Sequence, residues 1–388
     1  MTCSGVFNGT WPDRFGDSGP AARWLDSDRP RPSRWEGAGD QTAAALALAH
    51  ARKGVGLLYA GDYNGARQLL AAMGRRLRRP RRRGEPAGRS ASLADVFRAE
   101  RERAREEHEV LARLVVPLEA GYRLALRRAP DVRAACEEAL GPSPDGPSLL
   151  PLRDLLGLVG AHEWRRRGLF VPALGARIHP HHGVYAPVRG EPVELVARAA
   201  ESWPVTGKLA LDLGTGTGVL AFLLARAGAR VIATDLEPRA VACARENAAT
   251  LGLSEAVEVR RADLFPGERF DLLVSNPPWV PAEAHSALDR AVYDPGGRFL
   301  AALLSGIPGA LRQGGEAWVV LSDLAERLGL RPVGQVEALS AQAGLEVVQV
   351  LEARPAHPRS RDSDDPLHQA RSAEVTRLYQ LRVRAGAR

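Results

Sequence analysis

The sequence predicts an α/β fold with a largely parallel sheet for the C-terminal part of the chain, preceded by a mostly α-helical N-terminal domain. The first observation is that apolar, strand-like runs alternate with helical patterns from about Leu169 onward, which is typical of βαβ units. The second is that apolar residues before that point recur mainly at helical spacing. With 388 residues and a hydrophobic content of 45%, the chain is long enough for two domains with buried cores.

The N-terminal region is expected to divide into an arm and a helical domain. Residues 1–40 are rich in Gly, Pro, Asp and Arg, which predicts a disordered or loosely docked arm. Residues 41–168 predict the helical domain, which opens with a helical hairpin over 44–77. Its later helices are expected at 118–128, 131–140 and 148–167.

An arginine-rich linker is expected near residues 75–92, inside this domain. Residues 75–83 contain seven arginines, and a stretch rich in Gly, Pro and Ser follows. Such a run could bind a phosphate backbone without sequence preference, or it could be a solvated linker. After it, Ser92 is expected to cap a charged helix, with Asp95 in the capping-box position, that runs to about Val116.

The region 169–388 is expected to form the sheet domain. Its last two strand-like runs are joined by a loop, which predicts an antiparallel hairpin at the sheet edge. The strands and helices are expected at 209–213, 218–227, 230–234, 238–250, 257–262, 270–274, 299–311, 316–321, 333–343, 345–351 and 375–383.

A glycine-rich turn follows the first of these strands. Residues 214–218 read Gly-Thr-Gly-Thr-Gly and lead into a helix near Val219. Glycines let the backbone turn tightly and approach a ligand closely, and a helix N-terminus presents free N–H groups to that ligand. The dinucleotide-binding fingerprint needs another glycine where Val219 stands. The spacing therefore argues against an NAD-type site.

Three acids follow successive strands. Asp212 precedes the glycines and would repel a pyrophosphate, but it could receive an amino group directly or through water. Asp235 ends the second strand, where a carboxylate can accept both hydroxyls of a ribose. Asp263 closes the third strand and could accept the adenine amino group, with Leu236 and Leu264 on either side of the ring. These acids predict a nucleoside-binding site.

The most specific motif of the chain is Asn276-Pro277-Pro278-Trp279, which follows an apolar strand. The two prolines fix φ and remove two N–H donors. The Asn276 side-chain oxygen and the Pro277 carbonyl can then hold both hydrogens of an –NH2 group, which orients its nitrogen for attack without a strong base. Trp279 offers a flat face for a planar amide or a base.

The glycine segment 212–218, Asp235 and Asp263 resemble the successive motifs of class I S-adenosylmethionine-dependent methyltransferases. The Asn-Pro-Pro-Trp motif resembles the Asn-Pro-Pro-aromatic signature of members that methylate exocyclic base amines or glutamine amides, where Tyr or Phe is more usual than Trp. Segments 185–196, 280–283 and 291–300 are similar to stretches of the release-factor glutamine methyltransferases, within the small-domain group, although residues 190–193 depart from their pattern. The resemblance covers about 170–355. It implies a Rossmann-like seven-stranded sheet and S-adenosyl-L-methionine as cofactor.

The resemblance also implies a set of site residues. The catalytic residues implied are Asn276, Pro277, Pro278 and Trp279. The cofactor-binding residues implied are Asp212, Gly214, Thr215, Gly216, Gly218, Asp235, Leu236, Asp263, Leu264 and Asn276. The residues expected to line the substrate side are Tyr185, Arg189 and Tyr293. No metal is expected, because no acid or cysteine completes a tetrahedral set beside His179, His181 and His182.

These features together predict an N-methyltransferase acting on a planar nitrogen. The stretch after the motif favours a protein amide of the glutamine type, and the arginine run favours the alternative, an exocyclic amine in rRNA, tRNA or DNA. A ribosome-associated substrate would satisfy both, and a small-molecule acceptor also stays open. The rival from another class is a non-catalytic binding module that kept the fold. It predicts eroded motifs, whereas Asp212, Asp235, Asp263 and Asn276 all remain.

Composition adds weaker constraints on partners and compartment. The formal net charge is +7, which is compatible with a polyanionic partner, but nearly all the basic residues are arginine and suggest a coding bias instead. No run of about 18 apolar residues predicts a membrane span. The three scattered cysteines have no metal-type spacing and are odd in number, so a reducing cytoplasm is expected. Nothing in the sequence indicates the oligomeric state.

Overall fold

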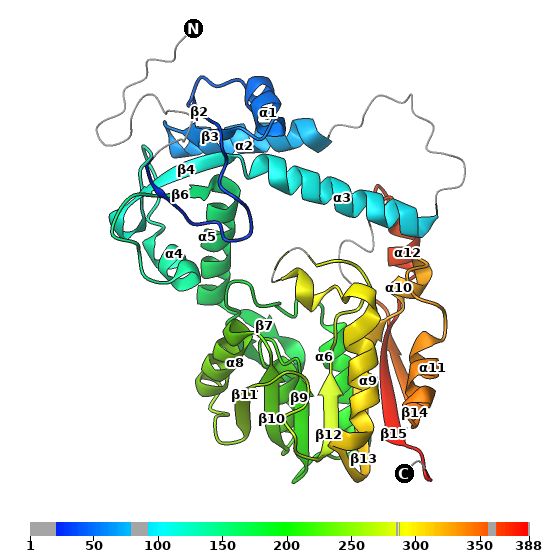
Figure 1. Cartoon of the computed structure of the whole chain (residues 1–388). Coiled ribbons are helices and arrows are strands. Elements are labelled where there is room, and N and C mark those ends of the chain that lie inside the picture. Colours follow the sequence, from blue (N-terminus) through cyan, green and yellow to red (C-terminus); the bar gives the residue numbers. More distant parts are fainter. Residues whose placement is uncertain (1–20, 79–91, 285, 287, 356–361, 387–388) are drawn as a thin grey trace. The chain divides into compact units, whose positions relative to one another are not determined.

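The computed structural model describes residues 21–78, 92–284, 286, 288–355 and 362–386, and it divides into two compact units (Figure 1). Unit 1 comprises Met1–Ser90 and Arg98–Glu163, and unit 2 comprises Ala91–Phe97 and Trp164–Arg388. This division lies a few residues before the boundary expected at 168. Helix α3 (Leu93–Leu111) begins in unit 2 and ends in unit 1.

Unit 1 is an α/β unit built on a six-stranded sheet. Its sheet order is β1-β6-β4-β3-β2, with β5 paired to β4. The strands are β1 (Arg23–Trp24), β2 (Trp35–Ala38), β3 (Gly56–Tyr59), β4 (Leu114–Glu119), β5 (Arg123–Leu124) and β6 (Ser148–Pro151). The helices are α1 (Ala44–Arg52), α2 (Tyr63–Arg78), α4 (Arg133–Leu140) and α5 (Leu152–Arg167), the last of which runs into unit 2.

The expectation of a mostly helical N-terminal domain is wrong in its architecture, because the helices pack with a sheet. β3 lies inside the stretch predicted as a helical hairpin, and all four of its residues are buried. β4 begins at Leu114, so α3 ends at Leu111 and the range 118–128 contains β5 where a helix was expected. Short apolar strands buried on both faces have no alternation to distinguish them from buried helix.

The expected arm and linker are only partly described. Residues 21–40 contain β1 and β2, which pair in parallel with β6 and β3, so this part of the arm is docked in the sheet. Residues 1–20 and most of the arginine-rich linker (79–91) lie outside the described residues. The capping box of α3 is confirmed: the Asp95 N–H donates to Ser92 Oγ at 3.2 Å, and the Ser92 N–H donates to Asp95 Oδ2 at 3.3 Å.

Unit 2 contains the predicted seven-stranded sheet, in the order β11-β10-β9-β12-β13-β15-β14. β9 to β13 are parallel, and β15 is antiparallel to both β13 and β14. The seven strands are β9 (Leu209–Leu213), β10 (Arg230–Asp235), β11 (Val257–Arg261), β12 (Phe270–Ser275), β13 (Leu311–Ser322), β14 (Leu345–Ala353) and β15 (Thr376–Val383). A separate small sheet pairs β7 (Leu169–Val171) with β8 (Ala176–Ile178). The predicted antiparallel pair is therefore confirmed, with β15 inserted between β13 and the edge strand β14.

Helices and apolar clusters cover both faces of this sheet. The helices of unit 2 are α6 (Glu191–Ser202), α7 (Val219–Arg226), α8 (Pro238–Thr250), α9 (Arg298–Ala310), α10 (Leu324–Arg327), α11 (Gln335–Gln342) and α12 (His368–Ser372). Leu272 and Val274 pack in the cluster that contains α6 and α7, while Leu273 between them packs in the cluster that contains α9. This alternation follows from the two-residue period of a strand. Among the described residues, no helix is both long and apolar enough to cross a membrane.

Candidate active site

A cavity of about 420 Å³ opens in unit 2 at the carboxyl ends of β9, β10 and β12. The chain leaves β9 for β10 on one side and later returns to β12 on the other, and ligands bind in α/β sheets at such a switch point. All the site residues expected from the sequence except Gly218 line this cavity. They therefore come together from segments that are up to about a hundred residues apart in the chain.

The glycine turn is held to the sheet by backbone hydrogen bonds. The N–H groups of Gly214 and Thr215 both donate to Thr234 O at 2.9 Å. Gly214, Gly216 and Gly218 all have positive φ, at 75°, 55° and 91°, which glycine adopts without a steric penalty. A Cβ built on Gly214 or Gly216 would meet no protein atom within 4 Å. The turn therefore presents open backbone to a ligand.

Asp212 is buried under this turn. Its Oδ2 accepts hydrogen bonds from Thr215 Oγ1 at 2.6 Å and from the Ala221 N–H at 3.0 Å. It thus ties the turn to the first residues of α7. Burial raises the pKa of Asp212 to about 6, and the two hydrogen bonds only partly oppose this increase.

Asp235 stands at the end of β10 with its two oxygens directed by the backbone. Oδ2 accepts from the Gly216 N–H and Oδ1 from the Glu237 N–H, both at 3.0 Å. Burial raises the pKa of Asp235, and these hydrogen bonds lower it. A carboxylate has about four acceptor positions on its two oxygens, so Asp235 can accept further hydrogen bonds from a pair of neighbouring hydroxyls.

The third acid differs slightly from expectation. β11 ends at Arg261, so Asp263 lies two residues past the strand, although it lines the cavity as expected. Leu264 has φ of 59°, which is rare for a residue with a side chain. Leu236 is 53% exposed at the cavity.

The Asn-Pro-Pro-Trp loop leaves β12 in a fixed position. Ser275 Oγ donates to Leu213 O at 2.8 Å and joins the ends of β12 and β9. The indole Nε1 of Trp279 donates to Asn276 Oδ1 at 2.8 Å, and the Trp279 N–H donates to Val292 O at 3.0 Å. The motif is therefore a packed turn whose asparagine already has one partner.

The segment expected on the substrate side also lines the cavity. The guanidinium of Arg189 lies over the Trp279 ring, 4.8 Å from its centroid, and Arg189 Nη1 donates to Glu374 Oε1 at 2.8 Å. Burial raises the pKa of Tyr185. Arg189 therefore lines the cavity and is also held in place by a buried carboxylate of the protein.

Sequence reasoning missed several residues that position the site. Asp294, 3% exposed, accepts the N–H groups of Phe299 at 2.9 Å and Leu300 at 3.1 Å and so caps α9 beside the cavity. Glu374 and Arg331 are buried far along the chain. Asp294 could have been found from its position before Pro-Gly-Gly and an apolar helix. Glu374 and Arg331 could not, because their partners are brought to them only by the fold.

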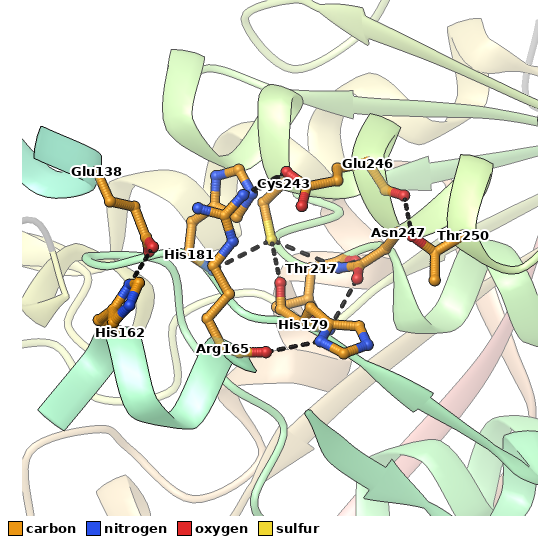
Figure 2. A network of polar contacts seen from close by, with 10 residues as sticks. All are labelled: Glu138, His162, Arg165, His179, His181, Thr217, Cys243, Glu246, Asn247 and Thr250. Carbon is orange, nitrogen blue, oxygen red and sulfur yellow. Dashed lines mark hydrogen bonds and ion pairs between the residues drawn. The ribbon is translucent and has the colours of Figure 1, made fainter. Parts of the chain in front are cut away.

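Asn247 on α8 connects the backbone of the glycine turn to the segment that precedes Tyr185 (Figure 2). Its Oδ1 accepts the His179 N–H at 2.7 Å, and its Nδ2 donates to Thr217 O at 3.1 Å. His179 Nδ1 contacts Arg165 O at 2.6 Å, and His181 Nε2 contacts Glu246 at 2.9 Å. The histidines thus have separate partners. In the described part of the chain, no group of three or more His, Cys, Asp or Glu could hold a metal ion.

Comparisons with known proteins find similarity to methyltransferases. Residues 178–349 match the family model described as "Methyltransferase small domain". Over 156 residues the chain is 42% identical to a release factor glutamine methyltransferase of Cereibacter sphaeroides, which covers 36% of this chain and 54% of that protein. It is 35% identical over 174 residues to the Bordetella pertussis protein of that name, covering 40% and 61%.

A relative with another substrate matches a shorter stretch. The chain is 40% identical over 86 residues to a tRNA1(Val) (adenine(37)-N6)-methyltransferase of Porphyromonas gingivalis, which covers 20% of this chain and 34% of that protein. The chain spans about half the length of the first curated relatives it matches. The matched family region begins at residue 178, which lies after the last residue of unit 1.

Proposed function

From the match of residues 178–349 to the methyltransferase small domain, we propose that the protein is an S-adenosylmethionine-dependent N-methyltransferase acting on the side-chain amide of a protein glutamine. The observation that carries the proposal is the position of Asn276 and Pro277 in the same cavity as the glycine turn, Asp212 and Asp235. One cavity then holds both a motif for an amide and a wall for a nucleoside. This arrangement suits the direct transfer of a methyl group between two bound molecules.

The residues present fit this cofactor. Gly214 and Gly216 leave room that a Cβ would fill. Asp235 has acceptor positions for the ribose hydroxyls, and Leu236 and Leu264 supply apolar surface for the adenine. Asp212 can receive the amino group of the methionine part directly or through water. S-adenosylmethionine, when bound, supplies an electrophilic methyl group on a positively charged sulfur.

The acceptor is held by hydrogen-bond acceptors. The Asn276 side-chain oxygen and the Pro277 carbonyl can bind the two N–H groups of a primary amide, which fixes the nitrogen and increases its lone-pair character. Pro278 has no N–H, so its backbone offers the acceptor no competing donor. The cavity thereby orients the nucleophile without a general base.

The charges around the cavity favour a protein acceptor over a nucleic acid. The described lining residues include five carboxylates (Asp212, Asp235, Glu237, Asp263, Asp294) and three arginines. Each arginine has a partner: Arg189 pairs with Glu374, Arg290 pairs with Glu237 at 2.9 Å, and Arg239 donates to His182 at 3.3 Å. Phosphate binding relies on available Lys and Arg, which this wall does not offer.

Apolar residues beside the cavity point in the same direction. Val188 lies between the lining residues Pro187 and Arg189 and is 56% exposed, and Leu288 lies two residues before the lining residue Arg290 and is 48% exposed. Exposed apolar surface of this kind is common where a polypeptide binds.

A reducing cytoplasm fits as the compartment, because Cys136 and Cys243 are free and buried.

Two measurements test the proposal. Calorimetry with S-adenosylmethionine should detect binding, and its absence at high micromolar cofactor would instead support a non-catalytic binding module. Labelled methyl groups should enter lysate material that protease removes and RNase and DNase leave intact. Label lost on RNase or DNase treatment would identify the nucleobase alternative, whose tRNA form is supported by the similarity to a tRNA methyltransferase.

The Asn276→Ala variant tests the site assignment. We expect it to bind the cofactor normally and to lose about 10²–10³-fold in turnover, as when a preorganised hydrogen-bonding partner is removed from an active site. Near-normal turnover would show that another residue holds the acceptor.

A further inference from the structure

The ring of Trp279 has a donor that a phenyl ring lacks, and this donor contacts the residue proposed to hold the acceptor. Its Nε1–H donates to Asn276 Oδ1 at 2.8 Å. An asparagine side chain has an acceptor at one end and a donor at the other, and a rotation of 180° exchanges them. Because the indole nitrogen only donates, it is compatible with one of these two orientations.

Trp279 is itself held on its ring and on its backbone. The guanidinium of Arg189 covers the ring at 4.8 Å from its centroid. Arg189 is kept in place by Glu374, 2% exposed, whose Oε1 also accepts the Ser322 hydroxyl at 2.6 Å. The buried side chain of Arg331 donates from Nη2 to Trp279 O at 2.9 Å. These contacts hold Trp279 at one face of its ring and at its backbone carbonyl.

We propose that Trp279 is a positioning residue whose indole N–H keeps Asn276 Oδ1 turned toward the methyl acceptor; this inference rests on the proposed function of the cavity. Oδ1 has two acceptor positions, so one can take the indole N–H and the other an N–H of the acceptor. In the reversed orientation, Asn276 would present its own –NH2 to the –NH2 of the acceptor, and two donors would face each other.

The proposal assigns the ring a role different from that of a stacking surface. Trp279 packs with buried residues of several apolar clusters, and Arg189 covers one of its faces. Its contribution to turnover would therefore come through Asn276, and its removal should change the rate of methyl transfer more than cofactor binding.

A spectroscopic experiment tests the contact without substrate or cofactor. The full chain is labelled with ¹⁵N-tryptophan, and the signal of Trp279 is assigned with Trp279→Phe, or with 3-benzothienylalanine at this position if that variant does not fold. We expect the Trp279 indole proton to exchange slowly with solvent, and Asn276→Leu to accelerate the exchange about tenfold, as expected for the loss of one hydrogen bond. An exchange rate unchanged by Asn276→Leu would overturn the proposal.

A kinetic experiment tests the consequence. Trp279→Phe should bind S-adenosylmethionine as the wild type does and methylate nuclease-treated lysate protein about 3–10-fold more slowly. The matched control is Trp203→Phe, since Lys208 Nζ lies 3.2 Å from the Trp203 ring centroid and Trp203 does not line the cavity. We expect this control to match the wild type.

The outcomes separate this inference from the proposed function. Wild-type turnover by Trp279→Phe, or a loss of cofactor affinity that accounts for its slower rate, would refute the positioning role. If the wild type itself binds no cofactor, the proposed function fails, while the exchange experiment still decides whether the indole fixes Asn276.

Discussion

At the residue scale, burial of Asp212 disfavours the charged form of its carboxylate. It is 1% exposed and accepts hydrogen bonds from Thr215 Oγ1 and the Ala221 N–H, and neither of these donors is a cation. A buried carboxylate without a cation destabilises the fold unless a ligand supplies the charge. This is consistent with a residue retained for binding an amino group, at a cost to the stability of the free protein.

The pKa of Asp212 leads to a prediction about pH. Burial raises this pKa from 3.8 to about 6, so between these values the folded chain binds the proton more tightly than the unfolded chain. Stability contributed by the neutral form is therefore lost as the pH rises through this window, and the loss, about 3 kcal/mol, is complete above it. We expect Asp212→Asn to unfold at higher urea than the wild type near neutral pH, and at similar urea at about pH 4.

Urea unfolding as a function of pH, compared between the two proteins, measures this effect. A difference in the free energy of unfolding that stays constant from acidic to neutral pH would show that Asp212 is not the group responsible. Calorimetry should find that Asp212→Asn binds S-adenosylmethionine more weakly than the wild type.

At the scale of elements, the turn between β9 and α7 depends on glycine for two different reasons. Gly216 faces open space, and its conformation alone requires glycine, whereas a Cβ on Gly218 would lie 2.2 Å from Phe222 Cζ, inside the helix packing. Gly218 does not line the cavity. The same motif therefore combines a ligand-facing glycine with a packing glycine.

This difference predicts unequal costs for two similar substitutions. Gly216→Ala should lose about 1–2 kcal/mol of unfolding free energy from positive φ alone. Gly218→Ala should lose about 2–5 kcal/mol, since overpacking against Phe222 adds to the strain. Urea denaturation of both variants measures the costs, and equal losses would contradict the packing role of Gly218.

At the scale of the whole molecule, the chain folds as two units with separate cores. The core of unit 2 includes a residue that lies far upstream of the rest of that unit in the sequence. Phe97, at the start of α3, is 6% exposed and packs with Val280, Leu328 and Leu367. Its ring lies 6.5 Å from that of Tyr293, which lines the cavity. Part of the wall behind the cavity thus depends on a segment that lies, in the sequence, between the two parts of unit 1.

We expect calorimetric unfolding to resolve which unit each core residue supports. S-adenosylmethionine should raise the transition of unit 2, because a ligand stabilises the part of the fold that binds it. Phe97→Ala should lower the free energy of unfolding of unit 2 by about 3–5 kcal/mol. Met73→Ala, in the buried core of unit 1, should lower the free energy of unfolding of unit 1 by about 2–5 kcal/mol. Both variants lowering the same transition would contradict the division.

The sequence predicted unit 2 well because its signals are local. Apolar runs alternate with helical patterns there, and the residues that end β9, β10 and β12 carry recognisable chemistry, so Asp212, Asp235 and Asn276 could be placed at one edge of a sheet. The sheet of unit 1 was not predicted, because β3 and β4 are short and buried on both faces and lack the alternation that identifies a strand.

The sequence by itself therefore determined the order of strands and helices around the cavity, the residue types that face it and the turn at Gly214. Only the tertiary structure decided which partners surround them: Glu374 beneath Arg189, Arg331 on the carbonyl of Trp279, and Phe97 behind Tyr293. The physical reason is that backbone propensity and periodicity act over a few residues, whereas these contacts join segments brought together by burial of the apolar core.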